Sequence, residues 1–234
     1  MILGLRYHEL GIIKALPPGK LLCLGYPDII ATAEELEALG LKQLEPVANQ
    51  RIAALHKWPG TIWEAEPLLR EMGFEPIYLD IAHQRGKEEL VDLNMPLPAY
   101  LERQFDAVID GGTIEHCMNI GGAWVNIARA MKSHAWVLHL NPANQVNHGF
   151  YSISPTLYAS WYREIILHRI TWLEKGEYIY KRLGNPNARG ILPVNACNVV
   201  VARYPRSDWP VQWKYSNKEL PTTSGPVLME PRPA

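Results

Sequence analysis

Short apolar runs alternate with helix-like stretches between residues 20 and 140, and this alternation limits the possible folds more than any other feature. The apolar runs are KLLCLG (20–25), EPIYLDI (75–81), FDAVI (105–109) and AWVLHL (135–140). Apolar runs bounded by turn residues are typical of strands buried on both faces. Helices are predicted at 28–39, 64–72 and 123–131, the first with Thr32 and Glu35 as a capping pair. The pattern predicts an α/β fold with a doubly wound, mainly parallel sheet.

The pattern changes after residue 164. Residues 165–172 and 198–204 read as two strands, which we expect to form a terminal antiparallel pair on the same sheet. We expect one domain over 1–204, with an N-terminal cap (1–18) and an insertion at about 41–60 that holds a helix at 45–57. Charged residues at 85–89 predict a solvated loop, and the Pro- and Trp-rich segment 205–234 a surface tail.

Composition excludes several classes of protein. The 24 acidic and 23 basic residues give a net charge of -1, which argues against broad electrostatic binding to nucleic acid or to a membrane. No apolar run approaches the roughly 18 residues of a membrane span, and the N-terminus does not resemble a secretory signal. The three cysteines form no CxxC pair, so neither a metal site nor a disulfide framework is indicated. We expect a cytoplasmic protein that can form oligomers.

Three common catalytic motifs are absent from the sequence. Without Gx4GK[ST] a P-loop nucleotide hydrolase is disfavoured, and without GxSxG an ordinary α/β-hydrolase. A dinucleotide oxidoreductase would need GxGxxG after the first strand.

Glycines and acidic residues follow the predicted strands. In an open parallel sheet, ligands bind outside the carboxyl ends of the strands, where glycine lets the backbone approach and a carboxylate accepts hydrogen bonds from ribose hydroxyls. The segments at these positions are Gly25-Tyr26-Pro27-Asp28, Asp80, Asp110-Gly111-Gly112-Thr113 and Asn141-Pro142-Ala143-Asn144.

Two segments carry a resemblance to a known family. FDAVIDGGTIEHCMN (105–119), followed by a helix and a strand, resembles the fourth-strand segment of class I S-adenosylmethionine-dependent methyltransferases, and DLNMPLP (92–98) resembles their adenine-side segment. The GYPDI loop and NHGFYSISPTLY (147–158) resemble a bacterial group of methyltransferase-like proteins. The resemblance covers about 20–204, and it implies a Rossmann-like methyltransferase fold with S-adenosylmethionine as the cofactor.

The resemblance also implies a cofactor site. Asp80 would hold the ribose hydroxyls, Asp92 and Leu93 would flank the adenine, and the turn Asp110-Gly111-Gly112 would line the methionine. Gly25 and Tyr26 would form the first loop. Two plainer interpretations stay open, since Asp80 could simply cap its turn and the Asp-Gly-Gly segment could be an ordinary tight turn.

The first loop departs from the family's GxGxG, because GYPDI keeps only its first glycine and proline lacks an N–H donor. A second hypothesis follows, in which the fold is kept, the cofactor is lost and the chain is a catalytically inactive binding or scaffolding module.

The polar and aromatic segment 147–158 suits an acceptor site for transfer to oxygen or nitrogen of a small-molecule or sugar-like acceptor. His148 is the candidate general base and His116 a second candidate, with residues 6–9 as a lid. Purely structural interpretations stay open as well. His148 could be a structural histidine, residues 115–116 could cap the following helix, and the aromatic side chains could simply pack. Candidate acceptor contacts are Asn144, Tyr151 and Tyr158.

Overall fold

The computed structural model describes residues 4–48, 56, 58–175, 177–183 and 192–203, and the backbone of two short strands, β9 (Trp213–Tyr215) and β10 (Val227–Met229). One eight-stranded sheet has the order β3-β2-β1-β4-β5-β8-β6-β7. Its strands are β1 (Gly19–Leu24), β2 (Phe74–Asp80), β3 (Glu88–Leu90), β4 (Phe105–Asp110), β5 (Met131–Pro142), β6 (Glu164–Glu174), β7 (Glu177–Arg182) and β8 (Cys197–Arg203).

The strand directions confirm the predicted sheet. Strands β1 to β5 pair in parallel, whereas β8 is antiparallel to both β5 and β6. The antiparallel end holds one strand more than predicted, because β7 adds to the outer edge of β6.

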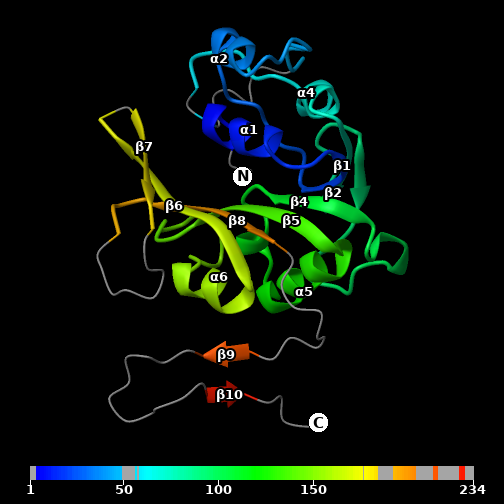
Figure 1. The fold of residues 1–234 in the computed structure, drawn as a ribbon, viewed down its shortest axis with the longest axis vertical. Coiled ribbons are helices and arrows are strands. Elements are labelled where there is room, and N and C mark those ends of the chain that lie inside the picture. Colours follow the sequence, from blue (N-terminus) through cyan, green and yellow to red (C-terminus); the bar gives the residue numbers. More distant parts are fainter. Residues whose placement is uncertain are drawn as a thin grey trace.

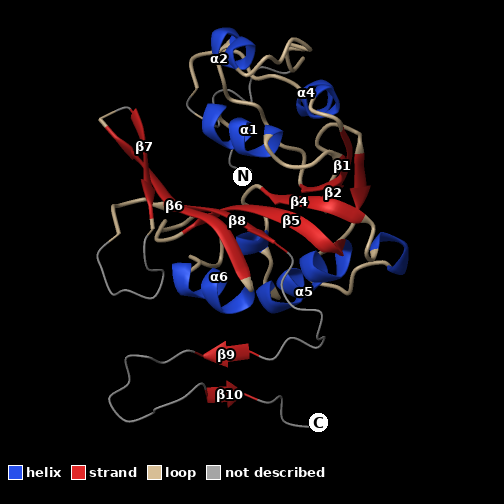
Figure 2. Ribbon diagram, in the orientation of Figure 1, coloured by secondary structure: helices blue, strands red, loops and turns tan. Residues whose placement is uncertain are grey.

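Helices cover both faces of the sheet, as expected for a doubly wound fold (Figure 1, Figure 2). On one face lie α1 (Tyr7–Lys14), α2 (Ala33–Ala38) and α4 (Ala65–Glu71), and on the other lie α5 (Ile120–Ala130) and α6 (Pro155–Trp161). Two 3-10 turns, η1 (Ala99–Leu101) and η2 (Ile114–His116), lie in the connections. Each face has its own apolar cluster, so the sheet is buried on both sides.

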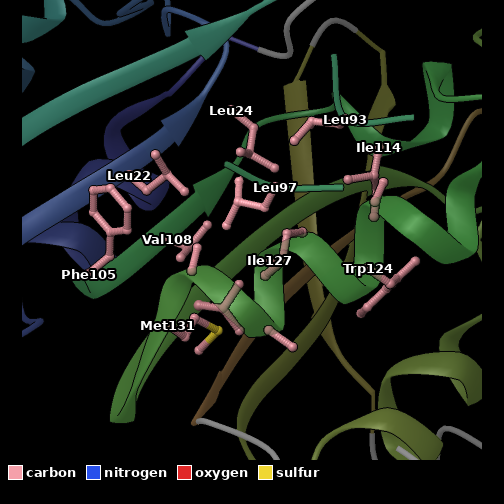
Figure 3. Close-up of a cluster of buried hydrophobic side chains, with 14 of the residues drawn as sticks. Leu22, Leu24, Leu93, Leu97, Phe105, Val108, Ile114, Trp124, Ile127 and Met131 are labelled. Atoms are coloured by element: carbon pink, nitrogen blue, oxygen red, sulfur yellow. The ribbon is translucent and has the colours of Figure 1, made fainter. Parts of the chain in front are cut away.

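The apolar cluster on the α5 face also holds the segment between β3 and β4 in place. Figure 3 shows Val108 of β4 and Ile127 of α5 packed together with Leu93 and Leu97 from the segment between β3 and β4. All four side chains are at most 5% exposed. Apolar burial therefore holds the segment 92–98 against the helix, next to the carboxyl ends of the strands.

Two predicted helices differ from the structure. Helix α2 begins at Ala33 rather than at residue 28, because Ile29 forms β-bridges with Leu5 and Trp63 that keep the backbone before Thr32 extended. The capping pair is confirmed: Thr32 accepts from the backbone of Glu35, whose side chain accepts from the Thr32 N–H. Of the helix predicted at 45–57, residues 45–48 are not helical, and most of the rest lies outside the described residues.

The prediction of a solvated loop at 85–89 is confirmed for the exposed residues 86 and 87 and is wrong for the rest. Arg85 forms an ion pair with Asp28, Glu88 is buried, and β3 starts there as a parallel partner of β2. The predicted tail lies outside the described residues apart from β9 and β10. No helix among the described residues is long and apolar enough to cross a membrane.

Candidate active site

The segments that follow β1, β2 and β4 meet at one edge of the sheet. The strand register sets Leu24 beside both Leu79 and Asp110, so Gly25 and Asp80 come next at the same edge. Gly25 has φ +81, which favours glycine, and its N–H donates to the Leu79 carbonyl at 2.6 Å. The Thr113 hydroxyl donates to the Leu24 carbonyl at 2.6 Å, which ties the loop after β4 to the end of β1.

Two of the acidic residues in the predicted cofactor site are bonded to their own turns. Asp80 Oδ1 accepts from the N–H groups of Ile81 (2.7 Å) and Ala82 (3.3 Å), and Asp92 Oδ1 accepts from the Asn94 N–H (2.9 Å). Asp80 is partly exposed and Asp92 is exposed. Among the described residues, Asp80 Oδ2 has no hydrogen-bond partner, so this oxygen can accept from a ligand.

A buried amide holds the predicted adenine-side segment in place. Asn126 of α5 donates from Nδ2 to the carbonyls of Leu93 (3.0 Å) and Met95 (2.8 Å), and its Oδ1 accepts from the Leu97 N–H (2.9 Å). Asn126 was not among the residues that the sequence pattern singled out. Its signal was a polar side chain on the apolar face of a helix, with Ala123 three residues before it and Ala130 four residues after it.

The first loop packs into the core. The ring of Tyr26 is 2% exposed and lies 4.5 Å from the ring of Tyr78, and its hydroxyl accepts from the Glu66 N–H at 3.3 Å. Asp28 is buried and pairs with Arg85. The Tyr26 ring therefore belongs to the core on the α4 face of the sheet.

Asp110 is the centre of a fully buried polar network. Its Oδ2 accepts from Asn141 Nδ2 and faces His139 Nδ1, both at 2.8 Å. Because a carboxylate can only accept, we assign the proton of His139 to Nδ1, and Nε2 then accepts from the Tyr162 hydroxyl at 2.7 Å. Oδ1 accepts from the N–H groups of Thr113 and Ile114. The carboxylate is thus fully engaged inside the protein.

Gly111 and Gly112 directly follow this carboxylate and are buried. Gly112 has φ +89, a conformation that side chains rarely adopt. The backbone of these two glycines, rather than the Asp110 side chain, is the part of the turn that can approach a ligand.

The two candidate catalytic histidines lie together beside a buried glutamate. The ring centroids of His116 and His148 are 5.4 Å apart. Glu115 is fully buried; its Oε2 accepts from Asn141 Nδ2 at 3.1 Å and its Oε1 lies 3.3 Å from His148 Nε2. Burial raises the pKa of Glu115 and lowers the pKa of His116. The Glu115-His116 pair was a family-like motif or a helix cap in the sequence, and the contacts of Glu115 to residues 26 and 33 positions away have no local pattern.

Two of the candidate acceptor contacts hold loops together. Asn144 donates from Nδ2 to the Pro193 carbonyl (2.8 Å) and accepts at Oδ1 from the Ala196 N–H (2.7 Å). The Tyr151 hydroxyl donates to the Met118 carbonyl at 2.9 Å.

Tyr158, the third candidate, is fully buried, and its hydroxyl donates to Asn141 Oδ1 at 2.8 Å. Burial raises its pKa, so the phenol stays neutral and supports the network around Asn141. His139 and Asn141 alternate in an apolar strand and so share one face, which was the readable sign of this network.

A cavity of about 420 Å³ lies at the carboxyl ends of β5 and β6. Residues from five separate parts of the chain border it, among them Arg6, Glu9, His148, Trp172, Tyr178 and Tyr180. The Arg6 guanidinium lies 4.1 Å from the centroid of the Tyr178 ring and donates to its hydroxyl at 3.1 Å. Burial raises the pKa of Cys197, which also borders the cavity, to about 12, so the thiol stays protonated. Residues 6–9 and His148 thus border one space.

Comparison with known proteins gave matches among solved structures only. No protein-family model matches the chain, and no curated protein matches it significantly. The 1,6-didemethyltoxoflavin-N1-methyltransferase of Burkholderia thailandensis, solved with S-adenosylhomocysteine, is 11% identical with a TM-score of 0.44, over 86% of this chain and 76% of that one. The YcgJ protein of Bacillus subtilis is 10% identical (TM-score 0.46, 86% and 100%). An S-adenosylmethionine-dependent methyltransferase of Aquifex aeolicus is 12% identical (TM-score 0.40, 85% and 89%).

These identities and TM-scores assign neither a cofactor nor an acceptor to this chain. The fold rests on its own topology: a parallel core in the order β3-β2-β1-β4-β5, antiparallel strands beyond β5 and helices on both faces. This is the doubly wound, Rossmann-like arrangement that the sequence resemblance implied.

Proposed function

We propose that this chain transfers a methyl group from S-adenosylmethionine to an oxygen or nitrogen of a small-molecule or sugar-like acceptor. One observation carries the proposal: the segments after β1, β2 and β4 meet at a single sheet edge, and the cavity that His148 borders lies further along that edge. A cofactor and an acceptor would then lie side by side at the carboxyl ends of the strands, where such folds bind their ligands.

The cofactor would be held mainly by backbone and by two carboxylates. Asp80 Oδ2 would accept from the ribose hydroxyls, and Leu93, whose carbonyl accepts from Asn126, would flank the adenine with Asp92 beside it. The backbone of Gly25, and that of Gly111 and Gly112 after β4, would approach the methionine part. In this proposal Tyr26 and Asp110 position the site from within the core.

The acceptor would occupy the cavity, with the Glu115–His116–His148 cluster beside it. The cofactor supplies an electrophilic methyl group on a sulfonium, so the chain mainly has to hold the nucleophile in line with it. As the bond from acceptor to methyl forms and the sulfur–methyl bond breaks, the acceptor loses a proton. We place that loss at this cluster, with His148 as the residue that borders the cavity.

Calorimetric titration with S-adenosylmethionine and, separately, S-adenosylhomocysteine tests the cofactor site directly. We expect saturable binding at micromolar levels, about -8 kcal/mol. A screen of hydroxyl and amine acceptors with the S-adenosylmethionine-bound protein would then identify the accepting atom.

The rival function is an inactive binding or scaffolding module. The packing of Tyr26 on Tyr78 favours it, because this loop replaces the family's glycine-rich turn. No heat and no thermal shift with either ligand at millimolar concentration would support the module and contradict methyl transfer.

A further inference from the structure

Three side chains with metal-binding atoms converge where η2 meets the loop after β5. One carboxylate oxygen of Glu115 and one ring nitrogen each of His116 and His148 lie within 4.8 Å of one another. Glu115 and His116 belong to η2, and His148 lies in the loop between β5 and α6. No sequence motif indicates a metal site here, because the ligand atoms come from positions 115, 116 and 148, without the short Cys or His spacing of known motifs.

Two of these atoms are buried and face each other without making a hydrogen bond. Glu115 is 0% exposed, and its Oε2 is bonded to Asn141. Its Oε1 and His148 Nε2 are buried as well and, although 3.3 Å apart, neither makes a hydrogen bond within the described part of the chain. Their ion-pair contact is long, and a buried carboxylate oxygen without a hydrogen bond is costly, so this pair of atoms points to a ligand between them.

The surroundings hold the cluster in place. Asn141, itself bonded to Asp110, fixes Oε2 of Glu115, which leaves Oε1 directed at the histidines. The Phe150 N–H donates to the Glu115 carbonyl at 2.9 Å and fixes the two loops to each other. A Cβ at Gly149 would lie only 3.0 Å from that same carbonyl oxygen, so glycine permits this close approach. Partners of this kind orient the ligands in metal centres.

We infer that Glu115, His116 and His148 bind one divalent transition-metal ion, such as Zn²⁺, Mn²⁺ or Fe²⁺. Two imidazoles and one carboxylate suit these ions, and three protein ligands leave positions open for water or substrate, as in catalytic rather than structural sites. Neighbouring ligand atoms in a tetrahedral site are about 3.3 Å apart, so binding would draw the most distant pair closer.

The inference rests on the proposed function for its chemical meaning and refines one step of it. His148 borders the cavity, so an acceptor hydroxyl there can reach an open position of the ion. A metal-bound hydroxyl loses its proton to solvent more easily, and its oxygen then forms the new bond to the methyl carbon as the sulfonium–methyl bond breaks. In this form His148 acts as a ligand, and the acceptor class narrows to hydroxyl compounds.

Titration of chelator-treated, dialysed full-length protein with Co²⁺ tests the site without any activity assay. We expect one Co²⁺ per chain, visible absorption bands from the bound ion, and displacement by Zn²⁺. Glu115→Gln, His116→Ala and His148→Ala should each weaken Co²⁺ binding by at least about 10-fold. His134→Ala, which removes an exposed histidine elsewhere on β5, is the matched control and should bind as the unaltered protein does.

Wild-type protein that shows no saturable Co²⁺ binding, or variants that bind Co²⁺ as tightly as it does, would overturn the inference. Glu115 is buried, and its variant can fail to fold; the partly exposed His116 then provides the test, with a thermal melt to show that its variant is folded. S-adenosylhomocysteine titration of the same samples separates the two proposals. Cofactor binding without Co²⁺ binding sinks only the metal site, and Co²⁺ binding without cofactor binding sinks only the methyl transfer.

Discussion

The two halves of the sheet edge satisfy their polar groups in different ways. In the β1–β3 half, Asp80 and Asp92 are bonded to residues one or two positions away. In the β4–β6 half, Asp110 is bonded to His139 and Asn141, 29 and 31 residues away, and all three are fully buried. The turns of Asp80 and Asp92 can therefore rearrange around a ligand at small cost, whereas the network around Asp110 is part of the folded core.

Asp110→Ala should have the largest effect and tests whether the β4–β6 half is structural. It leaves His139 and Asn141 without their buried acceptor, and we expect the free energy of unfolding to fall by about 3–5 kcal/mol in urea denaturation. Asp106→Ala, in the same strand, removes a partly exposed pair with Lys132 and should cost no more than about 1 kcal/mol. Equal losses of unfolding free energy in both variants would show that the buried network around Asp110 is no more structural than a surface ion pair.

His148→Ala tests whether this half also carries the chemistry. We expect turnover of an acceptor found in the screen to fall about 100-fold or more. The affinity for S-adenosylhomocysteine, measured by calorimetry, should change little, because His148 borders the acceptor cavity. His134→Ala serves again as the control. Full activity of the His148 variant would end its catalytic role.

Gly149→Ala tests whether the loop between β5 and α6 must approach η2 as closely as it does. Gly149 has φ +108, and its new Cβ would lie 3.0 Å from the Glu115 carbonyl oxygen, so we expect a loss of about 2 kcal/mol in unfolding free energy. Gly121→Ala is the opposite case: its Cβ meets nothing within 4 Å in α5, and the change should stabilise by about 0.5–1 kcal/mol. If both substitutions stabilise the protein, the close approach at Gly149 is not required.

Asp80→Ala should have the smallest effect and tests the β1–β3 half as a ligand site. We expect the affinity for S-adenosylhomocysteine to fall about 10-fold, or 1.4 kcal/mol, because one charged acceptor is lost. The unfolding free energy should hardly change, since Asp80 is partly exposed and is bonded only to its own turn. Unchanged affinity would remove Asp80 from the site.

The same division explains what could be predicted from the sequence. Strands β1, β2, β4 and β5 were found because their apolar runs are local, and so was the Thr32–Glu35 cap. The start of α2 was missed because the extended backbone at Ile29 depends on Leu5 and Trp63, far away in the chain. Strand β7 was missed even though Tyr178 and Tyr180 alternate along it, because its exposed residues gave no apolar run.

The residues of the candidate site also differ in how far the sequence could predict them. The positions of Gly25, Asp80 and the turn after β4 followed from strand ends alone. The pairing of Glu115 with His148 depends on how the loop after β5 folds back onto η2, and no short-range pattern encodes it.

The cavity has a consequence for the order of events during synthesis. Its walls combine Arg6 and Glu9 near the start of the chain with Tyr178 and Cys197 much later, and the contact between Arg6 and Tyr178 joins the two parts. A ribosome adds about 5–20 residues each second, and the first wall therefore leaves it many seconds before the second exists. The β1–β4 strands can pair during that interval, but the cavity forms only after Val199 has left the ribosome. A shorter nascent chain therefore lacks the cavity in which we propose that the acceptor binds.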